Sequence, residues 1–257
     1  MKVALCISGQ PRSALETFPY IKQNIILPNN ADVFIHMHYD SDNPYMEKFH
    51  LDNGTCLYKT NIDKELIGLY EPKSYLVEKP RNFQNSSLCI DEKRLSRSKD
   101  MNKHKEWTDE QHKVHTIKQV TSMYYSIYKC NELKEVFSNE NDIHYDYVIR
   151  IRFDLLPLEP VVCSMFNPKY INYLEIGQPD HMISDWINIG SNAVMNIYSS
   201  MYLNLEYMNT FDYYKLEDRV SPEPSNKCGG TCEHLLRDLM YLYRIPKRGF
   251  RMNCGLN

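Results

Sequence analysis

The sequence predicts an α/β fold in which a mainly parallel sheet is flanked by helices on both faces. A strand, helix, strand pattern over 3–35 and a strongly apolar strand over 145–154 carry this prediction. Units of this kind place parallel strands side by side through right-handed crossovers. The chain has 257 residues, 42% of them hydrophobic, which suits one large domain that buries its core without disulfides. We therefore expect a single domain over 1–257.

Three predicted strands define the N-terminal part of the sheet. The apolar runs at 3–7 and 31–35 are typical of buried strands. A third strand is expected over 73–78, because Pro72 and Pro80 bracket it.

An amphipathic helix is expected between the first two strands, since apolar side chains recur over 20–26. Ser13 and Glu16 fit a capping box, in which both side chains bind backbone N–H groups at the start of a helix. Pro19 would interrupt a helix begun there, so we expect the regular helix to begin nearer Thr17.

Residues 91–118 are dense in charges of both signs and lack apolar periodicity, which predicts an exposed charged loop or a solvated helix face. The spacing of His104, His112 and His115 within it matches no familiar metal-ligand pattern. Apolar residues at helical spacing then predict a long helix over 117–137.

The strand over 145–154 carries charged residues among apolar ones. Because side chains alternate across a strand, Arg150, Arg152 and Asp154 are expected on one face and apolar side chains on the other. Two arginines and a carboxylate would then project together at the carboxyl end of a buried strand.

Two more helices are expected near the C-terminus, over 192–208 and 233–243, with a Pro- and Gly-rich loop over 220–230 between them. Cys228 and Cys232 flank two glycines, but without two further ligands a zinc site is not indicated.

Polar residues follow the first strand, where ligands bind in open parallel sheets. Gly9 lets the backbone approach an anion closely, and Arg12 can bind phosphate oxygens in bidentate fashion. Ser8 and Gln10 complete this candidate donor-binding segment. A tight turn with a solvated arginine is an equally good interpretation.

After the second strand, Tyr39 is a candidate for stacking on a base and Asp40 for accepting hydrogen bonds from a ribose. The alternative is a strand end capped by polar residues.

Asp154 ends an apolar strand, where an unpaired carboxylate is costly. One explanation is an ion pair with Arg150 or Arg152. The other is a divalent cation, Mg²⁺ or Mn²⁺, held against a diphosphate whose charge the arginines share.

Composition excludes several classes. A formal net charge of -3 argues against a general nucleic-acid binder. No stretch approaches the roughly 18 apolar residues of a membrane span. The first apolar run ends too early for an export signal, so the eight cysteines are expected as thiols in a cytoplasmic protein.

The segments 4–12, 32–36, 145–154 and 184–191, with the motifs Ser-Gly-Gln-Pro-Arg and Arg-x-Arg-x-Asp, resemble a family of GT-A-type glycosyltransferases. Such proteins are found in polysaccharide gene clusters and large DNA viruses. The resemblance covers about residues 1–250 and implies a GT-A-like mixed sheet. It also implies transfer of a sugar from a UDP- or GDP-sugar to a hydroxyl of a glycan or glycoconjugate.

Carried over to this chain, the resemblance makes Gly9, Gln10 and Arg12 part of the nucleotide site. It implies that Arg152 and Asp154 hold the diphosphate and a metal, Mn²⁺ or Mg²⁺. The family pattern is Asp-x-Asp, and Arg152 replaces its first carboxylate.

The resemblance divides the chain into a nucleotide-binding half over 1–90 and a metal and acceptor half over 119–257. Asp185 is the preferred catalytic base and Asp180 the other candidate, because an inverting transfer needs a carboxylate beside the acceptor hydroxyl.

Two other functions stay open. The same crevice would serve a nucleotide- or glycan-binding module without turnover. A phosphate-transferring or hydrolysing α/β enzyme is the second alternative, but no P-loop or nucleophile elbow supports it.

Overall fold

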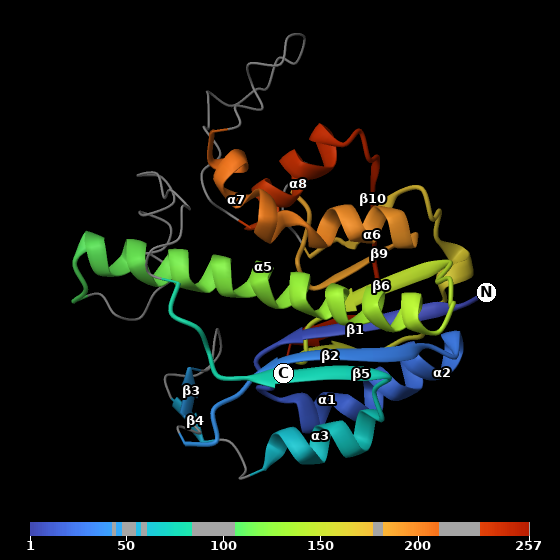
Figure 1. Ribbon diagram of the computed structural model, residues 1–257, viewed down its shortest axis with the longest axis horizontal. Helices are drawn as coiled ribbons and strands as arrows, with labels where there is room; N and C mark the ends of the chain where they lie inside the picture. The colour runs from blue at the N-terminus through green and yellow to red at the C-terminus, as the bar shows by residue number, and fades with distance from the viewer. Residues whose placement is uncertain are drawn as a thin grey trace.

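The structure is a computed structural model that describes residues 1–42, 45–47, 55–57, 61–83, 106–176, 182–210 and 232–256. Within these ranges a seven-stranded sheet forms the centre of the molecule (Figure 1). The strand order is β10 (Lys247–Phe250), β8 (Ile171–Leu174), β9 (Ile187–Gly190), β6 (Tyr147–Ile151), β1 (Val3–Gly9), β2 (Asp32–His38) and β5 (Ser74–Glu78).

The sheet is mainly parallel. β6, β1, β2 and β5 pair in parallel, and so do β8 and β10. β9 lies between the two groups and runs antiparallel to both β6 and β8. The predicted α/β class and the three N-terminal strands are confirmed. β1 and β2 are buried because helices cover both faces of the sheet, whereas β5 is an edge strand and is partly exposed.

Two short antiparallel pairs lie outside this sheet. β7 (Leu155–Pro157) pairs with β11 (Cys254–Leu256), and β3 (Tyr45–Glu47) pairs with β4 (Thr55–Leu57).

One face of the sheet is covered by the helices α5 (Asp109–Glu140), α6 (Asn192–Ser199), α7 (Met201–Thr210) and α8 (Cys232–Leu242) (Figure 1). Ala4, Cys6 and Phe34 face this side and pack in one core layer with Tyr124 of α5 and Tyr198 of α6.

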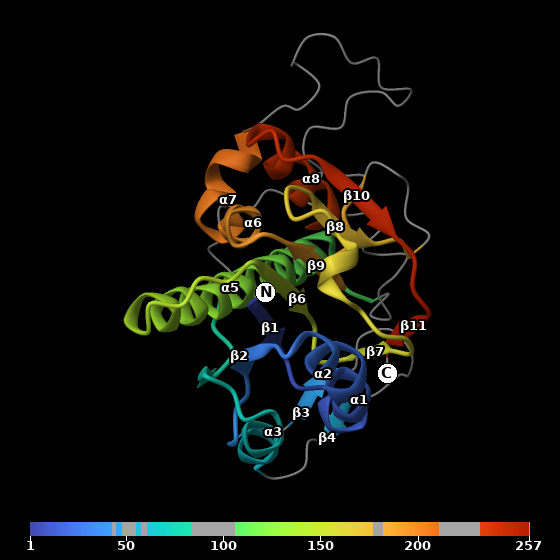
Figure 2. The ribbon, with the colours of Figure 1, turned by 90° about the vertical axis from the view of Figure 1, so that its right-hand side faces the viewer.

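The opposite face is covered by α1 (Ala14–Ile21), a π-helical turn (Lys22–Ile26), α2 (Leu27–Asn29) and α3 (Ile62–Tyr70) (Figure 2). A short 3₁₀ turn (Cys163–Met165) lies on the same side. Leu5, Ile7 and Ile35 alternate with the residues of the other face and pack in this second core layer.

The start of the first helix differs from the prediction. α1 begins at Ala14, not near Thr17, and the Ser13 side chain makes no capping hydrogen bond. Pro19 lies inside the helix, which continues because Phe18 and Ile21 pack on the sheet. The wider π-helical turn follows directly.

The sequence predicts an exposed charged loop or a solvated helix face over 91–118, and the last part of this segment is a helix. α5 begins at Asp109, where Thr108 and Gln111 form a capping box, with hydrogen bonds of 3.3 and 2.7 Å between side chain and backbone. His112 is only 1% exposed, and its ring lies against that of Trp107 with centroids 5.6 Å apart. His104 lies outside the described residues.

The C-terminal helices agree with the prediction in part. The expected helix over 192–208 is divided at Ser200 into α6 and α7, and α8 matches the helix expected over 233–243. The loop over 220–230, including Cys228, lies outside the described residues.

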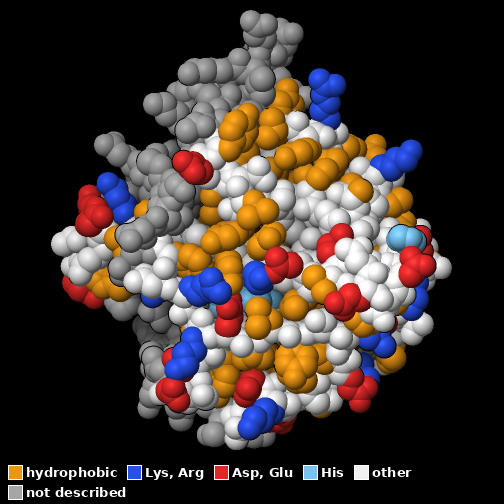
Figure 3. Space-filling view, viewed as in Figure 1, with side chains coloured by type: hydrophobic (Ala, Val, Ile, Leu, Met, Phe, Trp, Pro, Cys, Tyr) orange, Lys and Arg blue, Asp and Glu red, His pale blue; other side chains and the backbone are white. Residues whose placement is uncertain are grey.

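Charge on the surface is mixed. Among the described side chains of the face in Figure 3, Lys and Arg lie interspersed with Asp and Glu, and hydrophobic groups lie between them. None of the described helices is both long enough and apolar enough to cross a bilayer.

Candidate functional site

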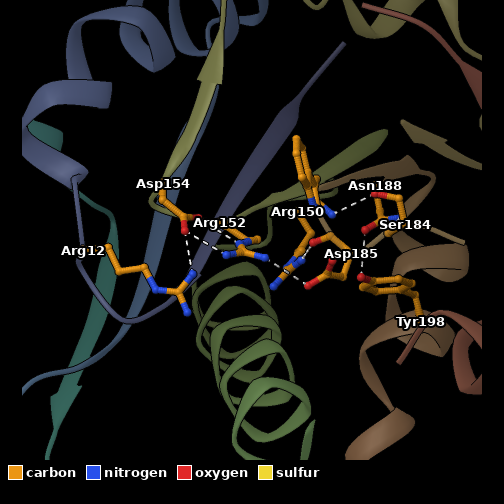
Figure 4. Close-up of polar contacts among 9 residues, drawn as sticks. Arg12, Arg150, Arg152, Asp154, Ser184, Asp185, Asn188 and Tyr198 are labelled. Carbon is orange, nitrogen blue, oxygen red and sulfur yellow. Dashed lines mark hydrogen bonds and ion pairs between the residues drawn. The ribbon is translucent and has the colours of Figure 1, made fainter. Parts of the chain in front are cut away.

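A cluster of arginines and aspartates lies at the carboxyl edge of the sheet. Arg12 follows β1, and Arg152 and Asp154 follow the neighbouring strand β6. Asp185 precedes β9, and because β9 is antiparallel to β6, its beginning lies at the same edge. Topology therefore brings four predicted site residues from three chain segments together (Figure 4).

Asp154 is the centre of this cluster. Arg152 donates two hydrogen bonds to it, from Nε to Oδ1 and from Nη2 to Oδ2, both of 2.8 Å. Arg12 donates from Nη1 to Oδ2 over 2.6 Å. The side chain of Asp154 is 6% exposed, so two guanidinium groups compensate a charge that would otherwise be expensive to bury.

The pKa of Asp154 reflects this competition. Burial by itself raises the pKa, but the charges of Arg152 and Arg12 and their hydrogen bonds lower it to about 2. The group is therefore ionised throughout the neutral range.

Arg152 also connects the cluster to Asp185. Its Nη1 lies 3.5 Å from Oδ2 of Asp185, while its other nitrogens bind Asp154. Arg150 is 3% exposed and donates a hydrogen bond to the backbone carbonyl of Asp185. The sequence predicts that Arg150 shares the charge of a bound diphosphate. In the structure Arg150 instead points into the core layer beneath α5 and orients the Asp185 segment.

Further polar contacts hold the Asp185 segment in place (Figure 4). The Asn188 side chain donates to the carbonyl of Ser184 over 2.9 Å, and the Tyr198 hydroxyl donates to Oδ1 of Asn188 over 2.8 Å. The backbone N–H of Trp186 donates to the hydroxyl of Ser184 over 3.2 Å. The carboxylate of Asp185 is thus positioned by two strands and α6.

The strand that carries the arginines is shorter than predicted. β6 ends at Ile151, and the chain turns through Phe153 and Asp154 into β7. The hydroxyl of Thr17 in α1 donates to the carbonyl of Phe153 over 2.5 Å. Asp154 therefore lies in a turn, because the strand cannot continue past the point where α1 and β7 pack.

The segment after β1 has unusual backbone geometry. Gly9 has φ of +126°, a conformation that L side chains rarely adopt, so this position requires glycine. Arg12 has φ of 33°, which is uncommon for a residue with a Cβ atom. Gln10 lies between them and is partly exposed, whereas Ser8 is buried. The strained backbone aims Arg12 at Asp154.

Tyr39 and Asp40 make their contacts with residues outside the cluster of arginines and aspartates. Tyr39 is 5% exposed and packs in the core layer of α1 and α3, which leaves almost none of its ring for stacking on a base. Asp40 forms an ion pair of 3.1 Å with Lys79. Asp180 lies outside the described residues.

The donor set around Asp154 does not fit a divalent cation. One carboxylate is bound by two guanidinium groups, and a cation there would meet their positive charge at hydrogen-bond distance. The cluster of Arg12, Arg150, Arg152, Asp154 and Asp185 instead carries one positive charge in excess, which suits an anion.

A second polar cluster, which the sequence reasoning missed, lies beside the first on the α5 side of the sheet. It consists of His36 and His38 at the end of β2 and Glu78 at the end of β5. The two histidines are two residues apart in a strand, so they share a face. The signal in the sequence is this His-x-His spacing at one strand end and a carboxylate at the next.

Burial and charge set the titration of this second cluster. Burial, then the neighbouring His38, lower the pKa of His36 to about 4, and burial also lowers the pKa of His38. Burial opposes ionisation of Glu78, but hydrogen bonds from Tyr125, Arg81 and His36 hold its pKa below the ordinary value. At neutral pH the cluster is therefore two neutral imidazoles and one carboxylate.

A comparison of the chain with protein-family models finds no match, and a comparison with curated proteins finds none either. Function is therefore inferred from the residues of the site.

Proposed function

We propose that the protein is a glycosyltransferase that moves a sugar from a nucleotide-diphosphate sugar to a hydroxyl of a glycan or glycoconjugate. The observation that supports this most is the convergence of Arg12 and Arg152 on Asp154 at the carboxyl edge of a parallel sheet. Ligands of open α/β sheets bind at this edge.

Arg12 and Arg152 bind the diphosphate in this proposal. A guanidinium group matches two phosphate oxygens with parallel hydrogen bonds, and it keeps its charge at every pH of interest. Asp154 holds both groups in place and balances one of their two positive charges. The arginines thereby supply the charge neutralisation that a metal supplies where the pattern is Asp-x-Asp.

Asp185 is the proposed base. Its carboxylate lies 3.5 Å from Arg152, so an acceptor hydroxyl beside a donor bound at Arg152 comes within reach of it. Removing the proton as the oxygen attacks the anomeric carbon requires a carboxylate at about 3 Å. The contacts of Asn188 and Arg150 keep the segment of Asp185 in position for this step.

The test is incubation of the full chain with a panel of UDP- and GDP-sugars and glycan acceptors, with and without Mn²⁺. Release of the nucleoside diphosphate measures turnover, and thermal stabilisation measures donor binding. We expect Arg152→Ala to weaken donor binding at least about tenfold, because a hydrogen bond to a charged group is lost. Asp185→Asn should lower turnover with donor affinity nearly unchanged.

Arg248→Ala is the matched control, since Arg248 is exposed on β10. Donor binding without turnover in the presence of acceptors would favour a binding module. Turnover of nucleotides that lack a sugar would favour a phosphate-transferring enzyme. Equal donor affinity in the wild type and Arg152→Ala would remove Arg152 from the proposed site.

A further inference from the structure

The second cluster is built by two neighbouring strands. His36 and His38 lie on the face of β2 that packs against α5, and Glu78 stands directly opposite His38 in the parallel pairing with β5. Ser126 of α5 contacts His36 from above the sheet, at 2.7 Å from Nδ1. Three potential ligands thus converge between the sheet and the helix.

The spacing of the ligand atoms is close to that of a small metal site. Nε2 of His36 lies 3.1 Å from Oε1 of Glu78, and the ligand atoms of the three residues lie within 4.8 Å of one another. Ligands about 2.0–2.1 Å from a tetrahedral ion are about 3.3 Å apart. Binding would therefore draw the most distant pair closer by at most about 1.5 Å, a small movement for side chains at a strand end.

An independent observation comes from His38, which is 2% exposed. Neither of its ring nitrogens makes a hydrogen bond of normal geometry with the described residues, although the backbone of Ser122 is close enough to affect its pKa. Buried polar groups in proteins are nearly always hydrogen bonded or bound to an ion. The hydroxyl of Ser8, across from His36 on the same face, is also buried without a partner in the described part of the chain.

The surrounding contacts leave the required atoms available. The contact with Ser126 occupies Nδ1 of His36 and leaves Nε2 directed at Glu78, as in metal-binding histidines whose other nitrogen is held by a second group. Arg81 binds Oε2 of Glu78 over 3.1 Å, so Oε1 still faces the histidines. Tyr125 stacks on His38 with ring centroids 6.0 Å apart and orients this ring.

We propose that His36, His38 and Glu78 bind one divalent transition-metal ion, Zn²⁺ in preference to Mg²⁺ or Mn²⁺. Two imidazole nitrogens and one carboxylate are ligands typical of zinc, whereas Mg²⁺ prefers oxygen ligands throughout. Three protein ligands leave a fourth position open. The site is separate from the arginine cluster, and its existence does not depend on the proposed glycosyltransferase activity.

The test is a titration of the full chain with Zn²⁺ by calorimetry and with Co²⁺ by visible absorption, after dialysis against a chelator. No donor or acceptor is added, so failure here is distinct from failure of the proposed function. We expect one equivalent to bind through nitrogen and oxygen ligands and to raise the melting temperature. His38→Gln and Glu78→Gln should each weaken binding by more than about tenfold, since loss of a group that merely orients a ligand already has an effect of this size.

His144→Gln is the matched control, because His144 is exposed, and it should bind as the wild type does. Circular dichroism of each variant checks the fold. The side chain of Glu78 is 19% exposed at the strand end, so Glu78→Gln decides the question if His38→Gln does not fold. Absence of stoichiometric binding to the wild type, or unchanged affinity in Glu78→Gln, would overturn the proposal.

Discussion

At the scale of single residues, charges decide what each of the two clusters can bind. The cluster around Asp154 contains three arginines and two aspartates, an excess of one positive charge that favours an anion. His36, His38 and Glu78 lie together and offer lone pairs suited to a cation. The ends of neighbouring strands in one sheet thus suit ligands of opposite charge.

The pH dependence of stability tests the environment of Asp154. Its folded pKa, about 2, lies below the ordinary value of 3.8, so ionisation stabilises the folded state. This contribution is fully present above about pH 4 and is lost as the pH falls through about 2. We expect Asp154→Asn to lower the free energy of unfolding by about 2 kcal/mol at pH 7, and the difference from the wild type to vanish near pH 2.

Urea unfolding of both proteins between pH 7 and pH 2 measures this difference. Glu140→Gln is the control, since Glu140 is exposed at the end of α5 and its removal should have little effect at any pH. A difference that stays constant from pH 4 to pH 2 would show that Asp154 acts through packing and not through its charge.

At the scale of elements, α5 is attached to the sheet and to α6 by buried polar contacts as well as by apolar ones. Lys134 is completely buried in α5. Its ammonium group donates to Oδ1 of Asn192 and, over 2.9 Å, to Oδ1 of Asn196, and it forms an ion pair with Glu135. Such contacts fix the rotation of α5 about its axis, because apolar packing alone is less directional.

Replacing the lysine measures this attachment. Lys134→Met keeps most of the volume but removes the ammonium donor from the side-chain oxygens of Asn192 and Asn196, so we expect a loss of about 2 kcal/mol in the free energy of unfolding. Urea unfolding measures it, with Lys118→Met on the exposed side of α5 as the control. Equal stability of the two variants would mean that apolar packing alone holds α5.

At the scale of the whole molecule, two core layers share one sheet. Leu5 packs in the layer of α1 and α3, and the next residue, Cys6, packs in the layer of α5 and α6. Every central strand contributes to both layers in this alternating way. Neither layer can keep its structure when the sheet opens.

Unfolding should therefore be one cooperative transition. We expect the same urea midpoint from far-ultraviolet circular dichroism, which reports helices, and from tryptophan fluorescence. Trp107→Phe makes the fluorescence report on Trp186, which packs against the layer of α1 and α3. Two separate midpoints would indicate that the two core layers unfold independently, contrary to the single domain that we expect.

The pattern of apolar and turn residues along the sequence was sufficient to predict the α/β class and the buried strands. It also predicted that Arg12, Arg152 and Asp154 lie at strand ends. Side-chain periodicity and turn residues are properties of short segments, so the sequence alone reveals them. Only the tertiary structure decided that Asp185 reaches Arg152, since this depends on the antiparallel placement of β9. It also decided that Tyr39 is buried and that His38 meets Glu78. Strand order and register bring distant segments together, and no local sequence signal encodes them.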